Sequence, residues 1–163
     1  MFLQTNAEDF FNAYEVLKES NEALINKLAN SPGNPSAAKA FGARPTMGVE
    51  IVCLAFSVEL YIKYLHYVIK HETPRGHDIL TLFRDLPEQT QQKIFSHPSI
   101  TNYGWSFPEF EKQIGYISDG FAKWRYSHEF TTLQYNSYFA LVFIDAVKFV
   151  SASERSHLAI VTN

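Results

Sequence analysis

Residues 49–69 read VEIVCLAFSVELYIKYLHYVI, one of the two most apolar stretches of the chain. Apolar side chains fall on nearly every side of a helix drawn through these residues, which is typical of a central helix covered by neighbours. A membrane-spanning helix needs about 20 apolar residues with few or no charges. Because Glu59 and Lys63 interrupt this stretch, we expect a core helix from about Thr46 to His71 and no membrane segment.

The segments on both sides of this stretch also carry helical patterns. A capping box over Thr5–Glu8 predicts a first helix that begins after Thr5 and ends at Ser31–Pro35. The residues Ser36–Ala43 are consistent with a short helical turn, and Pro45 interrupts the chain before the central helix.

Turn residues divide the rest of the chain into further helices. Thr73–Gly76 ends the central helix, and Asp78 stands where the next one begins. Two cap-x-Pro-Glu patterns, Asp85–Glu88 and Ser106–Glu109, each predict the start of a helix. The expected helices cover Ile79–Leu86, a segment from Pro87, Pro108–Phe130 and Thr132–Glu154, with a loop at His97–Trp105 and a frayed tail at Arg155–Asn163. No run shows strand alternation, so residues 1–163 are predicted to form one all-α domain, an up-and-down bundle of about five helices.

Composition narrows the function classes. The 163 residues carry a net charge of −3, so no global basic field attracts nucleic acid. Cys53 is the single cysteine, which excludes an internal disulfide framework and suits a reducing cytoplasm. His66 and His71 are five residues apart, a spacing unsuited to a zinc pair on a helix, so we expect no metal site. Without a glycine-rich phosphate loop, we expect no cofactor either.

Three motifs in order resemble the HEPN superfamily. Ser57–Leu65 contains a sequence similar to its "ELxLK" helix, Gly76–Phe83 resembles its "gHdLxxLf" turn, and Phe121–Glu129 resembles an "FxxWRYxyE" element of one branch. The match spans roughly Met47 to Val150. The resemblance implies an all-α bundle that often forms a homodimer. It also implies either a metal-independent ribonuclease or a non-catalytic module that binds RNA, nucleotide or protein, several of which act in toxin–antitoxin or antiphage systems.

The ribonucleases of that superfamily carry Arg-x(4–6)-His, and this chain departs from the pattern. After Arg125, the required positions hold Phe130, Thr131 and Thr132, while His128 comes only three residues later. Arg125, His128 and Glu129 can still share one helix face. They form either a phosphate-binding and proton-transferring group or a structural Arg125–Glu129 ion pair beside a half-exposed His128. Both interpretations stay open.

The other candidate residues also have two interpretations. Glu59 and Lys63 form an i,i+4 pair, either a polar pocket wall near Arg125 or a pair that orients helices. At the next turn, Arg75 and His77 are candidates for phosphate contacts at a helix start. The alternative is that His77 orders the turn while Asp78 caps the helix.

Aromatic residues offer a further candidate surface. Trp124 and Tyr126 are placed to stack on bases, although most aromatics in such a chain belong to the core. The last predicted helix is apolar around most of its circumference, which favours contact with a second subunit.

Three functions follow from the sequence. The favoured hypothesis is a HEPN-like module, non-catalytic or noncanonical, that binds RNA, nucleotide or a protein such as a cognate antitoxin in bacterial stress or defence. The second is a divergent metal-independent endoribonuclease that uses Arg125 and His128, and the third is a structural interaction domain.

Overall fold

The computed structural model describes residues 2–30, 48–118 and 135–161. Across these ranges the chain forms seven α-helices and no strand. The helices are α1 (Phe2–Ala29), α3 (Val49–Lys70), α4 (Ile79–Arg84), α5 (Glu88–Phe95), α6 (Pro98–Thr101), α7 (Phe107–Ser118) and α9 (Ser137–Val161). The prediction of an all-α fold is confirmed.

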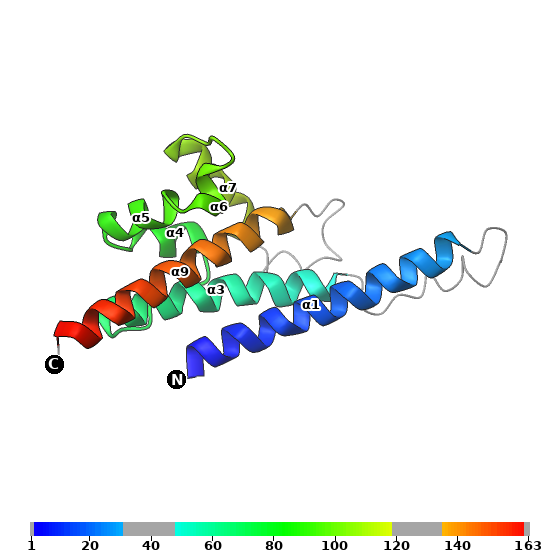
Figure 1. The fold of residues 1–163 in the computed structure, drawn as a ribbon, viewed down its shortest axis with the longest axis horizontal. Coiled ribbons are helices and arrows are strands. Elements are labelled where there is room, and N and C mark those ends of the chain that lie inside the picture. The colour runs from blue at the N-terminus through cyan, green and yellow to red at the C-terminus, as the bar shows by residue number, and fades with distance from the viewer. Residues whose placement is uncertain (1, 31–47, 119–134, 162–163) are drawn as a thin grey trace.

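Helix α3 is the centre of the fold, as its apolar sequence predicts. It packs against α1 on one side and α9 on the other, while the short helices α4–α7 pack on α3 and α9. Figure 1 shows that α1 runs antiparallel to α3, whereas α9 runs in the same direction as α3. Within the described residues α3 alone is long and apolar enough to cross a membrane, but 72% of that stretch is buried inside the bundle. Such burial is typical of the core helix of a soluble domain.

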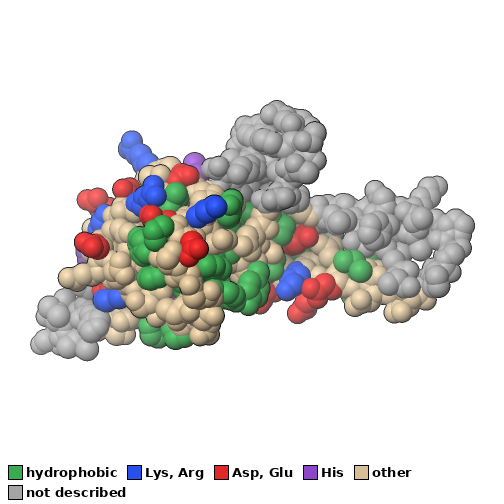
Figure 2. All heavy atoms as spheres, turned by 90° about the horizontal axis from the view of Figure 1, so that it is seen from above, with side chains coloured by type: hydrophobic (Ala, Val, Ile, Leu, Met, Phe, Trp, Pro, Cys, Tyr) green, Lys and Arg blue, Asp and Glu red, His purple; other side chains and the backbone are tan. Residues whose placement is uncertain are grey.

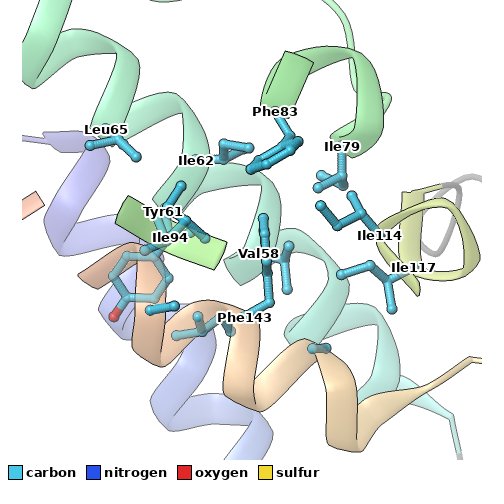
Figure 3. Close-up of a cluster of buried hydrophobic side chains, with 14 of the residues drawn as sticks. Val58, Tyr61, Ile62, Leu65, Ile79, Phe83, Ile94, Ile114, Ile117 and Phe143 are labelled. Carbon is cyan, nitrogen blue, oxygen red and sulfur yellow. The ribbon is translucent and has the colours of Figure 1, made fainter. Parts of the chain in front are cut away.

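Phenylalanine rings join the short helices to the long ones. Phe83 of α4 contacts Phe110 of α7 edge-to-face, with ring centroids 5.6 Å apart, and Phe143 of α9 at 6.3 Å. Phe110 and Phe139 also meet at 5.9 Å. Edge-to-face aromatic pairs stabilise a core beyond the area they bury. Figure 3 shows Phe83 and Phe143 together with aliphatic side chains of α3, α4, α5 and α7.

Several predicted boundaries are wrong. Helix α9 begins at Ser137, after the non-helical Tyr135 and Asn136, rather than at about Thr132, and α4 ends at Arg84 rather than Leu86. Helix α1 begins at Phe2 rather than after Thr5, and Glu8 accepts a hydrogen bond from Gln4 on the same helix face instead of closing a capping box. The predicted loop His97–Trp105 contains the short helix α6. Helix α9 continues to Val161, so the expected fraying of the tail is corrected for residues 155–161. Long-range hydrogen bonds of Glu154 and Arg155 hold that end of the helix.

Of the helix caps predicted at Asp78, Asp85 and Ser106, the structure confirms the first and the last. The Ser106 backbone N–H and hydroxyl both donate to Glu109, at 2.8 and 2.6 Å, which confirms the first turn of α7. Asp78 caps α4 through a 2.6 Å hydrogen bond from the Thr81 N–H. Helix α5, however, has Pro87 at its N-cap and no side-chain cap bond, so the capping role expected of Asp85 is not found.

The surface of the bundle carries mixed charge. Acidic and basic side chains alternate with apolar ones on the face that Figure 2 presents. Helix α9 is largely buried, as its apolar residues predict, but Tyr138 and Phe149 are 60% and 62% exposed. The face of α9 that bears these two rings is the part of the predicted subunit-contact surface that remains open.

Candidate functional site

A buried carboxylate on α3 organises the candidate site. Glu59 is 2% exposed, and its Oε1 accepts hydrogen bonds from Lys63 Nζ at 2.8 Å and from His77 Nδ1 at 2.9 Å. Lys63 is nearly as buried, one helical turn further along α3. A charge is rarely buried without a partner, so each of these groups depends on the other. The predicted Glu59–Lys63 pair is therefore present, and it extends to His77.

The turn before α4 brings His77 to this carboxylate. Gly76 has a backbone φ of +90°, a conformation that side-chain-bearing residues rarely adopt. The change of direction there turns His77 back toward Glu59, while 72% of its side chain stays exposed. Because Nδ1–H donates to the carboxylate, the ring has one tautomer in its neutral form, with the Nε2 lone pair available. Carboxylates fix catalytic and ligand-binding imidazoles in the same way.

Asp78 connects the start of α4 to the end of α7. Its Oδ1 accepts from the Thr81 N–H, and its Oδ2 accepts from the Ser118 hydroxyl at 3.0 Å. Burial acts to raise the pKa of the Asp78 carboxyl, but the hydrogen bonds from Thr81 and Ser118 outweigh it and leave the pKa lowered. Ser118 also accepts from the Leu80 N–H at 2.8 Å.

These bonds show that Asp78 caps α4, as one of the two interpretations expected, while the phosphate contact of Arg75 and His77 stays a prediction. Two N–H groups in the first turn of α4 are already bound, one by Asp78 and one by Ser118. Those two N–H groups are therefore not available to an anion at this turn, and the exposed side chains of His77 and Arg75 are the candidates to meet one. Arg75 is exposed and forms no ion pair or hydrogen bond within the described part of the chain. Sequence reasoning missed Ser118, which lies 40 residues from Asp78 and belongs to no motif.

Half of the predicted site lies outside the described residues. Trp124, Arg125, Tyr126, His128 and Glu129 all fall within 119–134, so their roles stay predictions. The structure brings together Glu59, Lys63 and His77, and it ties Asp78 to the adjoining helix end. Over the described ranges, no three His, Cys, Asp or Glu side chains gather closely enough to hold a metal ion.

Comparison with known families identifies the class of protein. The family model of the HEPN domain matches residues 52–152, which is more than half of the chain. The match begins at Val52 in the first turn of α3, includes the turn at His77 and ends at Ala152, after the first 16 of the 25 residues of α9. The chain therefore belongs to the HEPN domain family, and its helical fold agrees with that assignment. No curated protein and no solved structure matches it.

Proposed function

We propose that this HEPN domain binds RNA without cleaving it, through phosphate contacts made by His77 and Arg75. The observation that carries the proposal is the Glu59–His77 hydrogen bond, which fixes an exposed imidazole by a buried carboxylate. Arg75 stands two residues away with no described partner for its guanidinium. Arginine and protonated histidine both donate hydrogen bonds to phosphate oxygens.

The charge pattern suits a local contact. Glu59 and Lys63 balance each other in charge, and Arg75 supplies a positive charge at the turn. His77→Ala removes the imidazole that the hydrogen bond to Glu59 holds two residues after Arg75, so it should weaken RNA binding.

Fluorescence anisotropy with a labelled single-stranded RNA of mixed sequence, in EDTA, tests the proposal. Arg75→Gln should weaken binding and reduce the slope of log affinity against log salt by about 1, as loss of one phosphate contact predicts. Arg84→Gln is the matched control, because Arg84 is also exposed but already pairs with Glu111 at 2.7 Å. Circular dichroism of each variant checks the fold.

The same samples, separated on a denaturing gel, report cleavage. Intact RNA together with weakened binding in the Arg75 and His77 variants supports a non-cleaving RNA module. Cleavage lost in Arg125→Ala and His128→Ala would instead support the divergent ribonuclease. Absence of RNA binding by the wild-type chain, or equal binding by all variants, contradicts the proposal and directs attention to nucleotides or a protein partner.

A further inference from the structure

His77 combines an exposed ring with a fixed tautomer. Its Nδ1 lies 2.9 Å from Oε1 of Glu59, and 72% of its side chain is exposed. Because a carboxylate oxygen accepts, Nδ1 carries the proton of the neutral ring and Nε2 carries the lone pair. Within residues 2–30, 48–118 and 135–161, Nε2 forms no hydrogen bond. The described structure therefore leaves a nucleophilic nitrogen of His77 accessible to an electrophile.

The other histidines with described side chains lack this combination. His66 is 2% exposed, and its Nε2–H donates to a backbone carbonyl. His97 is largely buried and accepts a backbone N–H at Nδ1, so its Nε2 carries the proton of the neutral ring. His71 is exposed, but its ring meets that of Tyr67, with centroids 6.1 Å apart, and no described carboxylate fixes its tautomer. Among these histidines, His77 alone is both accessible and held by a carboxylate.

Glu59 is able to stabilise a positive charge on the His77 ring. Its Oε1 accepts from Lys63 and from His77, whereas its Oε2 is buried with no hydrogen-bond partner among the described residues. The carboxylate therefore keeps accepting capacity beyond its pair with Lys63. When Nε2 bonds to an electrophile, the ring becomes an imidazolium. A carboxylate in a site of low polarity stabilises the charge that develops in that step.

A guanidinium accompanies this nucleophile on the same turn. Arg75 precedes His77 by two residues, is exposed and has no ion pair or hydrogen bond within the described chain. Gly76, with a φ of +90°, separates the two residues. A guanidinium donates two parallel hydrogen bonds to phosphoryl oxygens. The electrophile that suits an imidazole nucleophile next to an arginine is therefore a phosphoryl group.

We propose that His77 is a phosphorylation site, which takes a phosphoryl group at Nε2 from a phosphoramidate, the chemical class that includes phosphohistidine on another protein. The Nε2 lone pair forms an N–P bond while the P–N bond of the donor breaks. The electron pair of the broken bond leaves with the donor nitrogen, which is protonated in the donor and departs as a neutral amine. The His77 ring takes the positive charge and keeps its Nδ1 proton, which it donates to Glu59, and Arg75 binds the phosphoryl oxygens.

Phosphorylation also controls the RNA contact, a consequence that rests on the function proposed above. The phosphoryl group adds negative charge at the position where an RNA phosphate is proposed to bind. It also occupies the guanidinium of Arg75. Because like charges repel, the modified domain releases RNA.

Potassium phosphoramidate tests the site without an enzyme. Treated wild-type protein is digested without acid and analysed by mass spectrometry, and phosphorus NMR distinguishes phosphoryl groups at Nε2 from those at Nδ1. We expect His77 to be modified at Nε2 alone, with an initial rate about tenfold higher than that of His71, as one charge-assisted hydrogen bond in the transition state gives. A histidine that is merely exposed would show neither preference.

Two variants assign the preference to the Glu59 carboxylate. The double variant Glu59→Leu with Lys63→Leu removes both buried charges together, and the rate at His77 should fall to that at His71. His71→Asn removes the reference histidine and should leave the rate at His77 unchanged. Circular dichroism checks the fold of each variant. Should the double variant fail to fold, the position of the phosphoryl group and the ratio of the two rates in wild type decide alone.

Fluorescence anisotropy of the treated protein tests the effect on RNA. Modification of wild type should weaken RNA binding by about tenfold, because a phosphate contact is replaced by a like charge. His77→Asn, treated in the same way, should keep the affinity that it has before treatment. The comparison separates phosphorylation of His77 from modification elsewhere in the chain.

Several outcomes would overturn the proposal. Equal rates at His77 and His71, modification at Nδ1, or an unchanged rate in the folded double variant would each exclude the phosphorylation site. RNA binding that is unchanged by modification of His77 would exclude its regulatory role. Absence of RNA binding before treatment would contradict the proposed RNA contact alone, because the rates and the position of the phosphoryl group are measured without RNA.

Discussion

Glu59 and His77 lie 18 residues apart in the chain, and a 2.9 Å hydrogen bond joins Oε1 of the buried carboxylate to Nδ1 of the exposed imidazole. The same oxygen accepts from Lys63. One carboxylate therefore stabilises the interior of α3 and also fixes the position of a surface histidine. The stability of the fold and the geometry of the candidate site depend on the same side chain.

Removal of this carboxylate should strongly destabilise the domain. Glu59→Ala leaves Lys63 buried without its counter-charge, and breaking a buried ion pair in this way costs about 3–5 kcal/mol. Urea denaturation measures the loss. Replacing both residues with Leu should recover much of it, since apolar side chains of similar size can replace a buried pair at little cost. Glu111→Ala, which breaks the exposed pair with Arg84, is the control and should change stability little. Equal effects of Glu59→Ala and Glu111→Ala would show that the Glu59 pair contributes no more than a surface pair.

Alanine substitution of the two aspartates expected to cap helices should lower the free energy of unfolding by different amounts. Asp78→Ala removes the acceptor of the Thr81 N–H and should cost about 1 kcal/mol, within a range of about 0.5–2. Asp85→Ala removes a side chain that makes no cap bond and should stay within about 0.5 kcal/mol of wild type. Chemical denaturation of both variants gives the comparison. A larger loss in Asp85→Ala would mean that the start of α5 depends on that carboxylate after all.

The main features of the fold could be predicted because they depend on residues that are close together in the sequence. The continuous apolar pattern of residues 49–69 predicts α3 and its burial, and the i,i+4 spacing of Glu59 and Lys63 predicts their ion pair. The capping box at Ser106 is likewise a contact between residues three apart. Such features depend on helix periodicity, which a sequence shows directly.

What the sequence did not predict depends on contacts between distant residues. Helix α9 extends past Glu154 because Lys93 pairs with that residue, and because Arg155 reaches Gln4 and Tyr64. Helix α6 begins at Pro98, after the N-cap residue His97, whose Nδ1 accepts from the Ser99 N–H, although histidine is not among the usual capping residues. No sequence pattern predicted the contact of His77 with Glu59 or that of Asp78 with Ser118.

Buried His66 should make the fold sensitive to acid. Its Nε2–H donates to the Leu82 carbonyl at 2.8 Å. Burial lowers the pKa of His66 from the ordinary value, and Lys70 adds to this effect, while the Leu82 bond and Asp85 act in the opposite direction. The unfolded chain, with a histidine pKa of about 6.5, therefore binds a proton that the folded chain resists. Stability from this group is fully present above about pH 6.5 and falls as pH drops, by up to about 1.4 kcal/mol per pH unit.

Variants assign this pH dependence to one residue. His66→Gln keeps an N–H donor for Leu82 and does not titrate, so its stability should fall less between pH 7.5 and 5.5. His71→Asn is the control, because His71 is exposed and its left-handed backbone, with φ of 57°, suits asparagine. Urea denaturation at both pH values measures the change in the free energy of unfolding with pH. If this change is the same in His66→Gln as in wild type and His71→Asn, His66 is not the source of the acid sensitivity.

The exposed rings of α9 should control self-association. Tyr138 and Phe149 are 11 residues apart, about three helical turns, so they occupy the same face of α9. A two-fold dimer presents the same patch on both subunits, and this face would bury two aromatic rings from each chain. We therefore expect a concentration-dependent dimer in sedimentation velocity, and Phe149→Glu should shift it toward monomer because a charge at the contact is desolvated. Val16→Glu changes an equally exposed residue on α1 and should leave the dimer intact. A wild-type chain that stays monomeric at every concentration, or equal dissociation by the two variants, would exclude this face as the contact.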